Sequence, residues 1–297
     1  MENNEKLIKK FERYILIDLG YLHKTFTAYR NSVITYLEWL SDNGIKPKKV
    51  TLDQLYDFIA YRRQKGDAER TVAGYRTVLK HFNQAIGVKD NPALLLHLAK
   101  CDRKTPTNII DAEFIDAVYR DTSANTLVQK RDRCILGMML FMGLQRTELS
   151  SLQLEHLDLE GARLYVPASA STNERYINLN PKQMMHLSHY IYDIRPSLLK
   201  FFSKQTNQLF FSSGIGNKLD GALNLMLKRI KLECHYVKSF KQLKQSRMVI
   251  WVKEHGLRQA QYLGGYRYVT SVQRYDFKSL DDLHKLLKFH HPMEKMA

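Results

Sequence analysis

The chain has few of the residues that cross-link a protein or anchor it in a membrane. Its three cysteines, Cys101, Cys134 and Cys234, lie far apart, and their spacing fits neither a disulfide framework nor a zinc site. We therefore expect reduced thiols in a cytoplasmic protein that needs no metal or cofactor. No run of about 18 apolar residues occurs, and the first five residues are too polar for a signal peptide, so no membrane partner is expected.

Acidic residues are also scarce relative to basic ones. The 297 residues include 46 Lys and Arg against 30 Asp and Glu, which gives a formal net charge of +16 and a pI of about 9.6. This excess is larger than solubility requires, so a polyanion, above all nucleic acid, is the expected partner. The hydrophobic fraction of 44% is sufficient for packed cores, and the length allows two domains.

The front of the chain has the periodicity of helices. Apolar residues recur at helical spacing between 26 and 40, and Asn43-Gly44 supplies a C-terminal stop signal. Thr51 is the predicted N-cap of a helix over 52–65, and a third long helix is predicted over about 68–86. The front of the chain is therefore predicted to be entirely helical.

A polar, basic stretch separates these helices from the rest of the chain. We predict a linker over 96–107, because this segment contains several charged residues and the helix-breaking Pro106. The chain then divides into a helical domain over 1–95 and a second domain over 108–297. Within the second domain the pattern predicts helices that flank three short strands, at 157–159, 163–167 and 175–179. The expected fold class is mainly α with a small antiparallel sheet (α+β).

Three segments of the second domain carry the most specific patterns. Residues 264–275 read GGYRYVTSVQRY and follow a helical stretch, residues 143–152 read GLQRTELSSL, and residues 239–246 read SFKQLKQS. In this order and spacing they resemble the active-site boxes of the tyrosine recombinases (phage-type integrases). The stretch 262–275 is particularly similar to integrases of Bacteroidetes-type mobile elements, which implies a role in DNA integration or recombination.

The resemblance implies both an architecture and a reaction. The front helices would form a core-binding domain, and residues 108–297 a catalytic-type domain with a C-terminal tail helix, the two closing around double-stranded DNA. In the family a tyrosine hydroxyl attacks phosphorus and the 5′ oxygen leaves, which gives a 3′-phosphotyrosyl link without metal or cofactor. The amphipathic segment 280–289 would dock on a neighbouring subunit, so a homo-oligomer, or a hetero-oligomer with another recombinase, is expected on DNA.

The family's site positions fall on named residues here, and most of them are substituted. Tyr275 occupies the nucleophile position, and Glu148 keeps the acidic position of the first box. The first arginine, the histidine, the second arginine and the His/Trp position are replaced, in that order, by Gln145, Lys241, Lys244 and Tyr266. The strand turn 168–173, where the family has a catalytic lysine, contains no cation.

These substitutions bear on the chemistry. Arginine forks stabilise the charge on the non-bridging oxygens, and losing one such donor costs on the order of 10²–10³ in rate. Gln145 carries no charge, and Lys244 lacks the planar fork. Arg146 is expected to point elsewhere, since one residue along a helix rotates the side chain by about 100°. We therefore favour a catalytically impaired, accessory or targeting subunit.

Two alternatives are kept beside this interpretation. The first is an active site-specific recombinase in which cations such as Arg175 or Lys241 have taken over, and the second is an integrase-derived DNA-binding regulator. All three bind DNA, because affinity rests mainly on many phosphate contacts. The basic residues expected to contact DNA are Arg62, Arg63, Arg70, Arg76, Lys80, Arg146, Arg175, Arg247 and Arg267.

Overall fold

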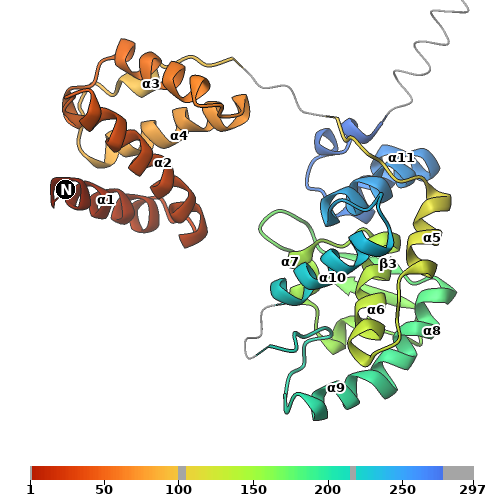
Figure 1. Ribbon diagram of the computed structural model, residues 1–297. Coiled ribbons are helices and arrows are strands. Elements are labelled where there is room, and N and C mark those ends of the chain that lie inside the picture. The colour runs from red at the N-terminus through yellow and green to blue at the C-terminus, as the bar shows by residue number, and fades with distance from the viewer. Residues whose placement is uncertain (1, 100–104, 215–218, 277–297) are drawn as a thin grey trace, which may run out of the picture. The chain divides into compact units, whose positions relative to one another are not determined.

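The computed structural model describes residues 2–99, 105–214 and 219–276. The chain divides into two compact units, Met1–Arg103 and Lys104–Ala297 (Figure 1). Part of the predicted linker, residues 100–104, and the predicted tail segment 280–289 lie outside the described residues. Among the helices that the structure describes, none has the length and apolar character needed to cross a membrane.

The first unit is built from helices around an aromatic core. Phe58 lies at the centre, and its ring centroid is 5.0, 5.5 and 5.1 Å from those of Tyr36, Trp39 and Tyr75. Apolar side chains at helical spacing fill the space around these rings. The elements are α1 (Glu2–Arg13), a π-helical turn (Tyr14–Asp18), α2 (His23–Asp42), a 3₁₀ turn (Pro47–Lys49), α3 (Leu52–Gln64), α4 (Glu69–Ala85) and a 3₁₀ turn (Pro92–Leu94).

The helix ends in this unit follow the local sequence signals. The Thr51 hydroxyl accepts a hydrogen bond from the Gln54 N–H at 3.3 Å, and the Gln54 side chain accepts one from the Thr51 N–H at 3.0 Å. The predicted N-cap of α3 is therefore confirmed. Helix α2 ends just before Asn43, and Gly44 follows with a φ of 66°, which a residue without Cβ adopts readily.

The second unit packs helices around a three-stranded sheet. The strands are antiparallel in the order β1-β2-β3, with Leu164 opposite Ile177. Leu164, Val166 and Ile177 face the core, together with most residues of α6 after its first turn, so the predicted mainly α fold with a small antiparallel sheet is confirmed. The elements are α5 (Ala112–Asp121), α6 (Leu127–Met142), α7 (Arg146–Ser151), β1 (Leu157–Asp158), β2 (Arg163–Val166), β3 (Arg175–Asn178), α8 (Pro181–His189), α9 (Arg195–Phe201), α10 (Asp220–Glu233) and α11 (Phe240–Gly264).

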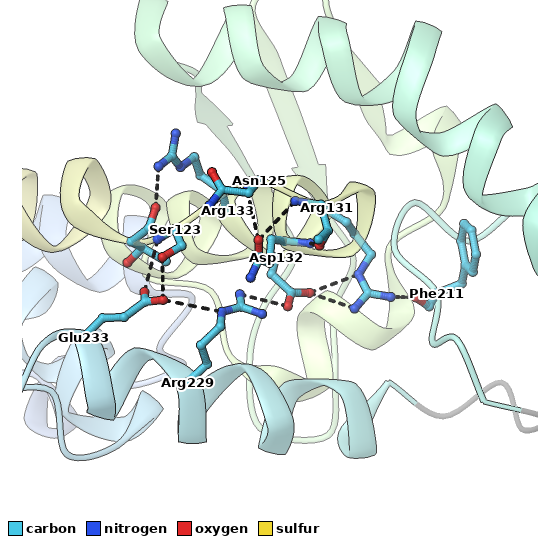
Figure 2. Close-up of polar contacts among 11 residues, drawn as sticks. Ser123, Asn125, Arg131, Asp132, Arg133, Phe211, Arg229 and Glu233 are labelled. Atoms are coloured by element: carbon cyan, nitrogen blue, oxygen red, sulfur yellow. Dashed lines mark hydrogen bonds and ion pairs between the residues drawn. The ribbon is translucent and has the colours of Figure 1, made fainter.

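A polar network ties α10 to α6, as Figure 2 shows. On α6, Arg131 directs Nε and Nη2 to Asp132 Oδ1 at 3.1 and 2.7 Å, and both side chains are buried. From α10, Arg229 Nη2 donates to the other carboxylate oxygen of Asp132 at 3.1 Å. One turn further along α10, Glu233 accepts hydrogen bonds from the backbone and hydroxyl of Ser123 at 3.1 and 2.7 Å. These contacts fix the position of α10 (Figure 2).

Helix α11 is interrupted at Gly256, whose φ of 77° and ψ of 174° are not helical. The second half of α11 therefore takes a new direction and ends at Gly264. Gly265 follows with a φ of 69°, and the chain continues into two 3₁₀ turns, Val269–Ser271 and Gln273–Tyr275. Since only glycine adopts such φ values without strain, these two positions aim the C-terminal turns back at the start of α11.

Candidate active site

The three segments with specific sequence patterns meet around one cleft of about 440 Å³. The start of α7, the start of α11 and the turns after α11 each contribute to its walls. All the substituted family positions line it, as does Tyr275, while Glu148 lies beneath it. The lining residues are Leu144, Gln145, Arg146, Thr147, Ser171, Thr172, Phe240, Lys241, Lys244, Gln245, Tyr266, Arg274 and Tyr275.

The Tyr275 phenol is held by two neighbours. Its side chain is 1% exposed, and its oxygen accepts a hydrogen bond from Arg274 Nη2 at 2.7 Å. The hydroxyl of Tyr266 lies 3.0 Å from the same oxygen. Burial, reinforced by the neighbouring Tyr275, raises the pKa of Tyr266, so this phenol keeps its proton at neutral pH and can donate it in a hydrogen bond.

A buried charge cluster lies beneath the phenols. Glu148 accepts a hydrogen bond from Arg175 Nη1 at 2.7 Å and lies 4.0 Å from Lys244 Nζ. Burial alone would raise the pKa of the Glu148 carboxyl, but the Arg175 hydrogen bond and the Lys244 charge outweigh it, so this pKa is lowered. Burial lowers the pKa of Lys244 to about 8, against the opposing effect of Glu148. At neutral pH two cations therefore share one carboxylate.

The same cluster fixes the end of α11. Arg175 Nε donates to the carbonyl of Leu263 at 2.8 Å, and Lys244 Nζ donates to the carbonyl of Gly264 at 3.2 Å. The Lys244 ammonium also lies 5.2 Å from the ring centroid of Tyr266, a cation–π distance. The buried charges thus position the turn that carries Tyr266.

Gly265 allows the guanidinium of Arg175 to approach this turn. A Cβ on Gly265 would lie 2.5 Å from Arg175 Nη1, which is too close for any real contact. The Gly265 carbonyl also accepts a hydrogen bond from the Asn173 N–H at 2.9 Å, and Thr172 forms an isolated bridge with Tyr266. The strand turn that lacks a cation is therefore joined directly to the turn before Tyr275.

Gln145 and Arg146 both line the cleft, which corrects the expectation that Arg146 would point elsewhere. The expected helical rotation does not apply, because Gln145 is the N-cap of α7 with extended φ and ψ. The Gln145 N–H donates to Glu148 at 2.8 Å, and Arg146 Nη2 donates to Asp220 at 2.9 Å. Of the cations at this wall, Arg146 is thus partly neutralised, and Lys241 is exposed.

The structure also corrects the role expected for Arg175. Its side chain is 0% exposed and its charge is directed to Glu148, so a direct contact with a DNA phosphate does not fit its position. The pairing with Glu148, which lies 27 residues earlier, carries no local sequence signal.

The other residues predicted to contact DNA fall into two groups. Some are engaged in contacts within the protein: Arg62 pairs with Asp67 at 2.8 Å, Arg63 pairs with Glu69 at 2.9 Å, and Arg247 Nε donates to the Leu140 carbonyl at 2.6 Å. The exposed group on α4 comprises Arg70, Arg76 and Lys80. Arg267, at the turn after α11, is exposed and also donates to the Ser169 carbonyl at 3.1 Å.

The contact between Arg274 and Tyr275 was not predicted. Arg274 stood out only as one of many basic residues, and adjacent residues usually point in different directions. In the tight 3₁₀ turn Gln273–Tyr275, however, the guanidinium folds back, and its Cζ lies 4.9 Å from the Tyr275 ring centroid.

No group of three or more His, Cys, Asp or Glu side chains that could hold a metal ion occurs within 2–99, 105–214 and 219–276.

The chain resembles known proteins along nearly its whole length. The family model described as "Phage integrase, N-terminal SAM-like domain" matches residues 8–86. The chain is 26% identical to tyrosine recombinase XerD of Staphylococcus aureus, covering 97% of this chain and 99% of that one. It is 24% identical to tyrosine recombinase XerC of Bacillus pumilus, with 98% of each chain covered.

Two solved structures have a similar fold. XerH site-specific recombinase bound to palindromic difH substrate matches with a TM-score of 0.72 and 14% identity, covering 89% of this chain and 80% of that one. The Tn1549 transposon integrase in complex with a circular intermediate DNA matches with a TM-score of 0.67 and 14% identity, covering 95% of this chain and 99% of that one.

Proposed function

We propose that this chain, which resembles the tyrosine recombinases along nearly its whole length, binds duplex DNA and acts in the integration or site-specific recombination of a mobile element. The net charge of +16 supports a polyanionic partner, and the exposed cations of α4 supply phosphate contacts in the unit that resembles a core-binding domain. The cleft around Tyr275 is the part of the second unit suited to a single phosphodiester.

We further propose that strand cleavage in this cleft is slow and that the chain works beside another recombinase as an accessory or targeting subunit. The observation that carries this is the shared carboxylate: Arg175 and Lys244 both contact Glu148, and Gln145 is neutral. Charge that is bound to Glu148 is less able to stabilise a phosphorane-like transition state. Losing one pre-organised donor typically costs on the order of 10²–10³ in rate.

The reaction assigned to the cleft is a transesterification. The Tyr275 oxygen forms a bond to phosphorus, and the bond from phosphorus to the 5′ oxygen breaks. The proton lost by the phenol is balanced by the proton that the 5′ oxygen gains. Tyr266 orients the attacking oxygen through the 3.0 Å hydrogen bond between the two phenols.

The test uses the full chain and a DNA duplex that has been selected for binding to this chain. A random-sequence duplex pool is first selected for binding, and the selected site is then synthesised with a nick close to the cleavage position, so that the covalent product is trapped. We expect salt-dependent binding, and a covalent adduct that forms at least about 10²-fold more slowly than the adduct of S. aureus XerD on its own nicked site. Tyr275→Phe is the control, which should bind normally and form no adduct.

Two results would count against this proposal. Adduct formation as fast as that of the comparison enzyme would show that the substitutions do not impair cleavage. Absence of specific DNA binding would remove the recombination role altogether.

One observation favours a second candidate, an active recombinase with a relocated cation. Arg274 donates directly to the nucleophile position at 2.7 Å, and it is not one of the cations that share Glu148. Fast adduct formation in the same assay would select this candidate. Sequence-specific binding with no adduct, even after long incubation, would instead favour a DNA-binding regulator or a purely accessory subunit.

A further inference from the structure

Four cations line the cleft, and Arg274 differs from the others in what it contacts. Lys244 shares Glu148, Arg146 donates to Asp220, and Lys241 is exposed without a contact to either phenol among the described residues. Arg274 takes part in none of the ion pairs formed within 2–99, 105–214 and 219–276, yet it donates to the Tyr275 oxygen.

We propose that Arg274 is a catalytic residue that holds a non-bridging oxygen of the scissile phosphate beside the Tyr275 oxygen, in place of the arginine that Gln145 does not supply. The proposal rests on the proposed function, because it requires duplex DNA in this cleft. It assigns the cation for whatever cleavage the chain performs, fast or slow.

The guanidinium has the donors that this role needs. It presents five N–H groups in a planar fork, and Nη2 uses one of them on Tyr275. Its Nε is buried and has no hydrogen-bond partner among the described residues. A buried donor without a partner is costly, and an entering phosphate oxygen would satisfy it.

The position of Arg274 also keeps the cation and the nucleophile together. Both belong to the 3₁₀ turn Gln273–Tyr275, and the guanidinium lies 4.9 Å from the Tyr275 ring centroid. Any shift of this turn toward DNA carries both groups. A cation on another element, such as Lys241 on α11, would have to be brought into register separately.

The transesterification conserves protons, because water accepts one and supplies one. The Tyr275 oxygen bonds to phosphorus as its proton passes to water, and the 5′ oxygen leaves after taking a proton from water. The negative charge that builds on the non-bridging oxygens is met by the Arg274 guanidinium, which neither gains nor loses a proton because its pKa is far above the working pH.

The experiment compares two nicked duplexes of the selected sequence, one with a normal phosphodiester and one with a methylphosphonate at the cleavage position. The methylphosphonate lacks the charged non-bridging oxygen. We expect Arg274→Gln to slow adduct formation on the phosphodiester by about 10²–10³ and on the methylphosphonate by less than about tenfold. Arg274→Lys, which keeps the charge without the fork, should fall between wild type and Arg274→Gln on the phosphodiester.

Lys200→Gln serves as the matched control. It removes one exposed positive charge from α9, outside the cleft, and should leave both rates unchanged. Equilibrium binding of each variant to the selected duplex is measured in parallel by fluorescence anisotropy, so that a lost rate is not confused with lost binding.

Three results would overturn the assignment. Equal slowing on both substrates would mean that Arg274 only holds Tyr275 in place, and an unchanged rate would mean that it does nothing in the step. Normal DNA binding with no adduct from the wild type on either duplex would overturn it while the DNA-binding role stands. Loss of specific binding by the wild type would instead be the failure of the proposed function.

Discussion

Two buried carboxylates in the second unit, Asp132 and Glu148, are each shared by two cations, but only the Glu148 cluster has a member, Lys244, that lines the cleft. Asp132 lies between Arg131 and Arg229 and joins α6 to α10 (Figure 2). Glu148 lies between Arg175 and Lys244 and joins α7 to β3 and α11. The side chains of the two carboxylates are 4% and 1% exposed, so the burial is comparable.

The difference lies in how the charges balance. Around Asp132 the second acid, Glu233, lies 4.0 Å from Arg229, and the remaining Arg131 donor reaches the Phe211 carbonyl at 2.8 Å. Two cations therefore meet two acids. Around Glu148 two cations meet one acid, and Lys244 borders the cleft. The first cluster only connects helices, whereas the second leaves positive charge where an anion can enter.

The largest effect, on the free energy of unfolding, is expected from neutralising either carboxylate. Glu148→Gln leaves the fully buried Arg175 without its counter-charge, and Asp132→Asn does the same to Arg131, so each should lower the free energy of unfolding by about 3–5 kcal/mol. Urea denaturation of both variants and the wild type measures this. If Glu148→Gln cost less than about 1 kcal/mol while Asp132→Asn cost the full amount, the two clusters would not be equivalent in stability.

A pH series separates the clusters next, because only the Glu148 cluster contains a lysine. The pKa of Lys244 is about 8 in the folded protein, against 10.5 as the ordinary value. Between these pH values Lys244 is protonated in the unfolded chain and mostly neutral in the folded chain. The free energy of unfolding therefore rises with pH over this range. From pH 7 to 9.5 wild type should gain about 2 kcal/mol relative to Lys244→Met.

The measurement is urea denaturation of both proteins at several pH values, taken as the difference between them. Taking the difference removes the effects of the buried tyrosines, which both proteins share. If the free energies of unfolding of the two proteins changed in parallel across this pH range, burial would not lower the pKa of Lys244.

The smallest effect concerns DNA. Lys244→Gln should reduce the salt dependence of binding by about one phosphate contact, whereas Arg229→Gln should leave it unchanged. Affinities for the selected duplex measured across a salt series give the slopes directly. A loss of slope in Arg229→Gln of the same size would place the Asp132 cluster in the DNA-binding surface and end the contrast between the two.

Local signals in the sequence predicted the helices and strands well. They did not predict which side chains distant in the chain would pair. The Thr51 cap, the α2 stop and the three strands all rest on neighbouring residues, and the structure has them where the pattern indicated. The approach of the three patterned segments to one cleft came from the resemblance, not from periodicity. Whether each charge inside that cleft would be neutralised could not be read from the sequence.

The misjudged cations show why. Arg175 and Glu148 are far apart in the chain, so nothing local indicated that the guanidinium would be buried and paired. Arg146 was treated as helical relative to Gln145, but the N-cap residue has an extended backbone and the rule fails there. Arg274 reaches Tyr275 only because the chain forms a 3₁₀ turn, which the amino-acid pattern did not predict.

Gly265 has a further consequence for how this region can vary. Because a methyl group there would collide with the Arg175 guanidinium, replacing Gly265 with alanine forces one of two outcomes. Either the guanidinium retreats and its contact with Glu148 lengthens, or the turn opens and carries the two phenols away from each other. The absence of a side chain at Gly265 thus couples the Arg175–Glu148 contact under the cleft to the alignment of the Tyr275 oxygen. A change in one is expected to change the other.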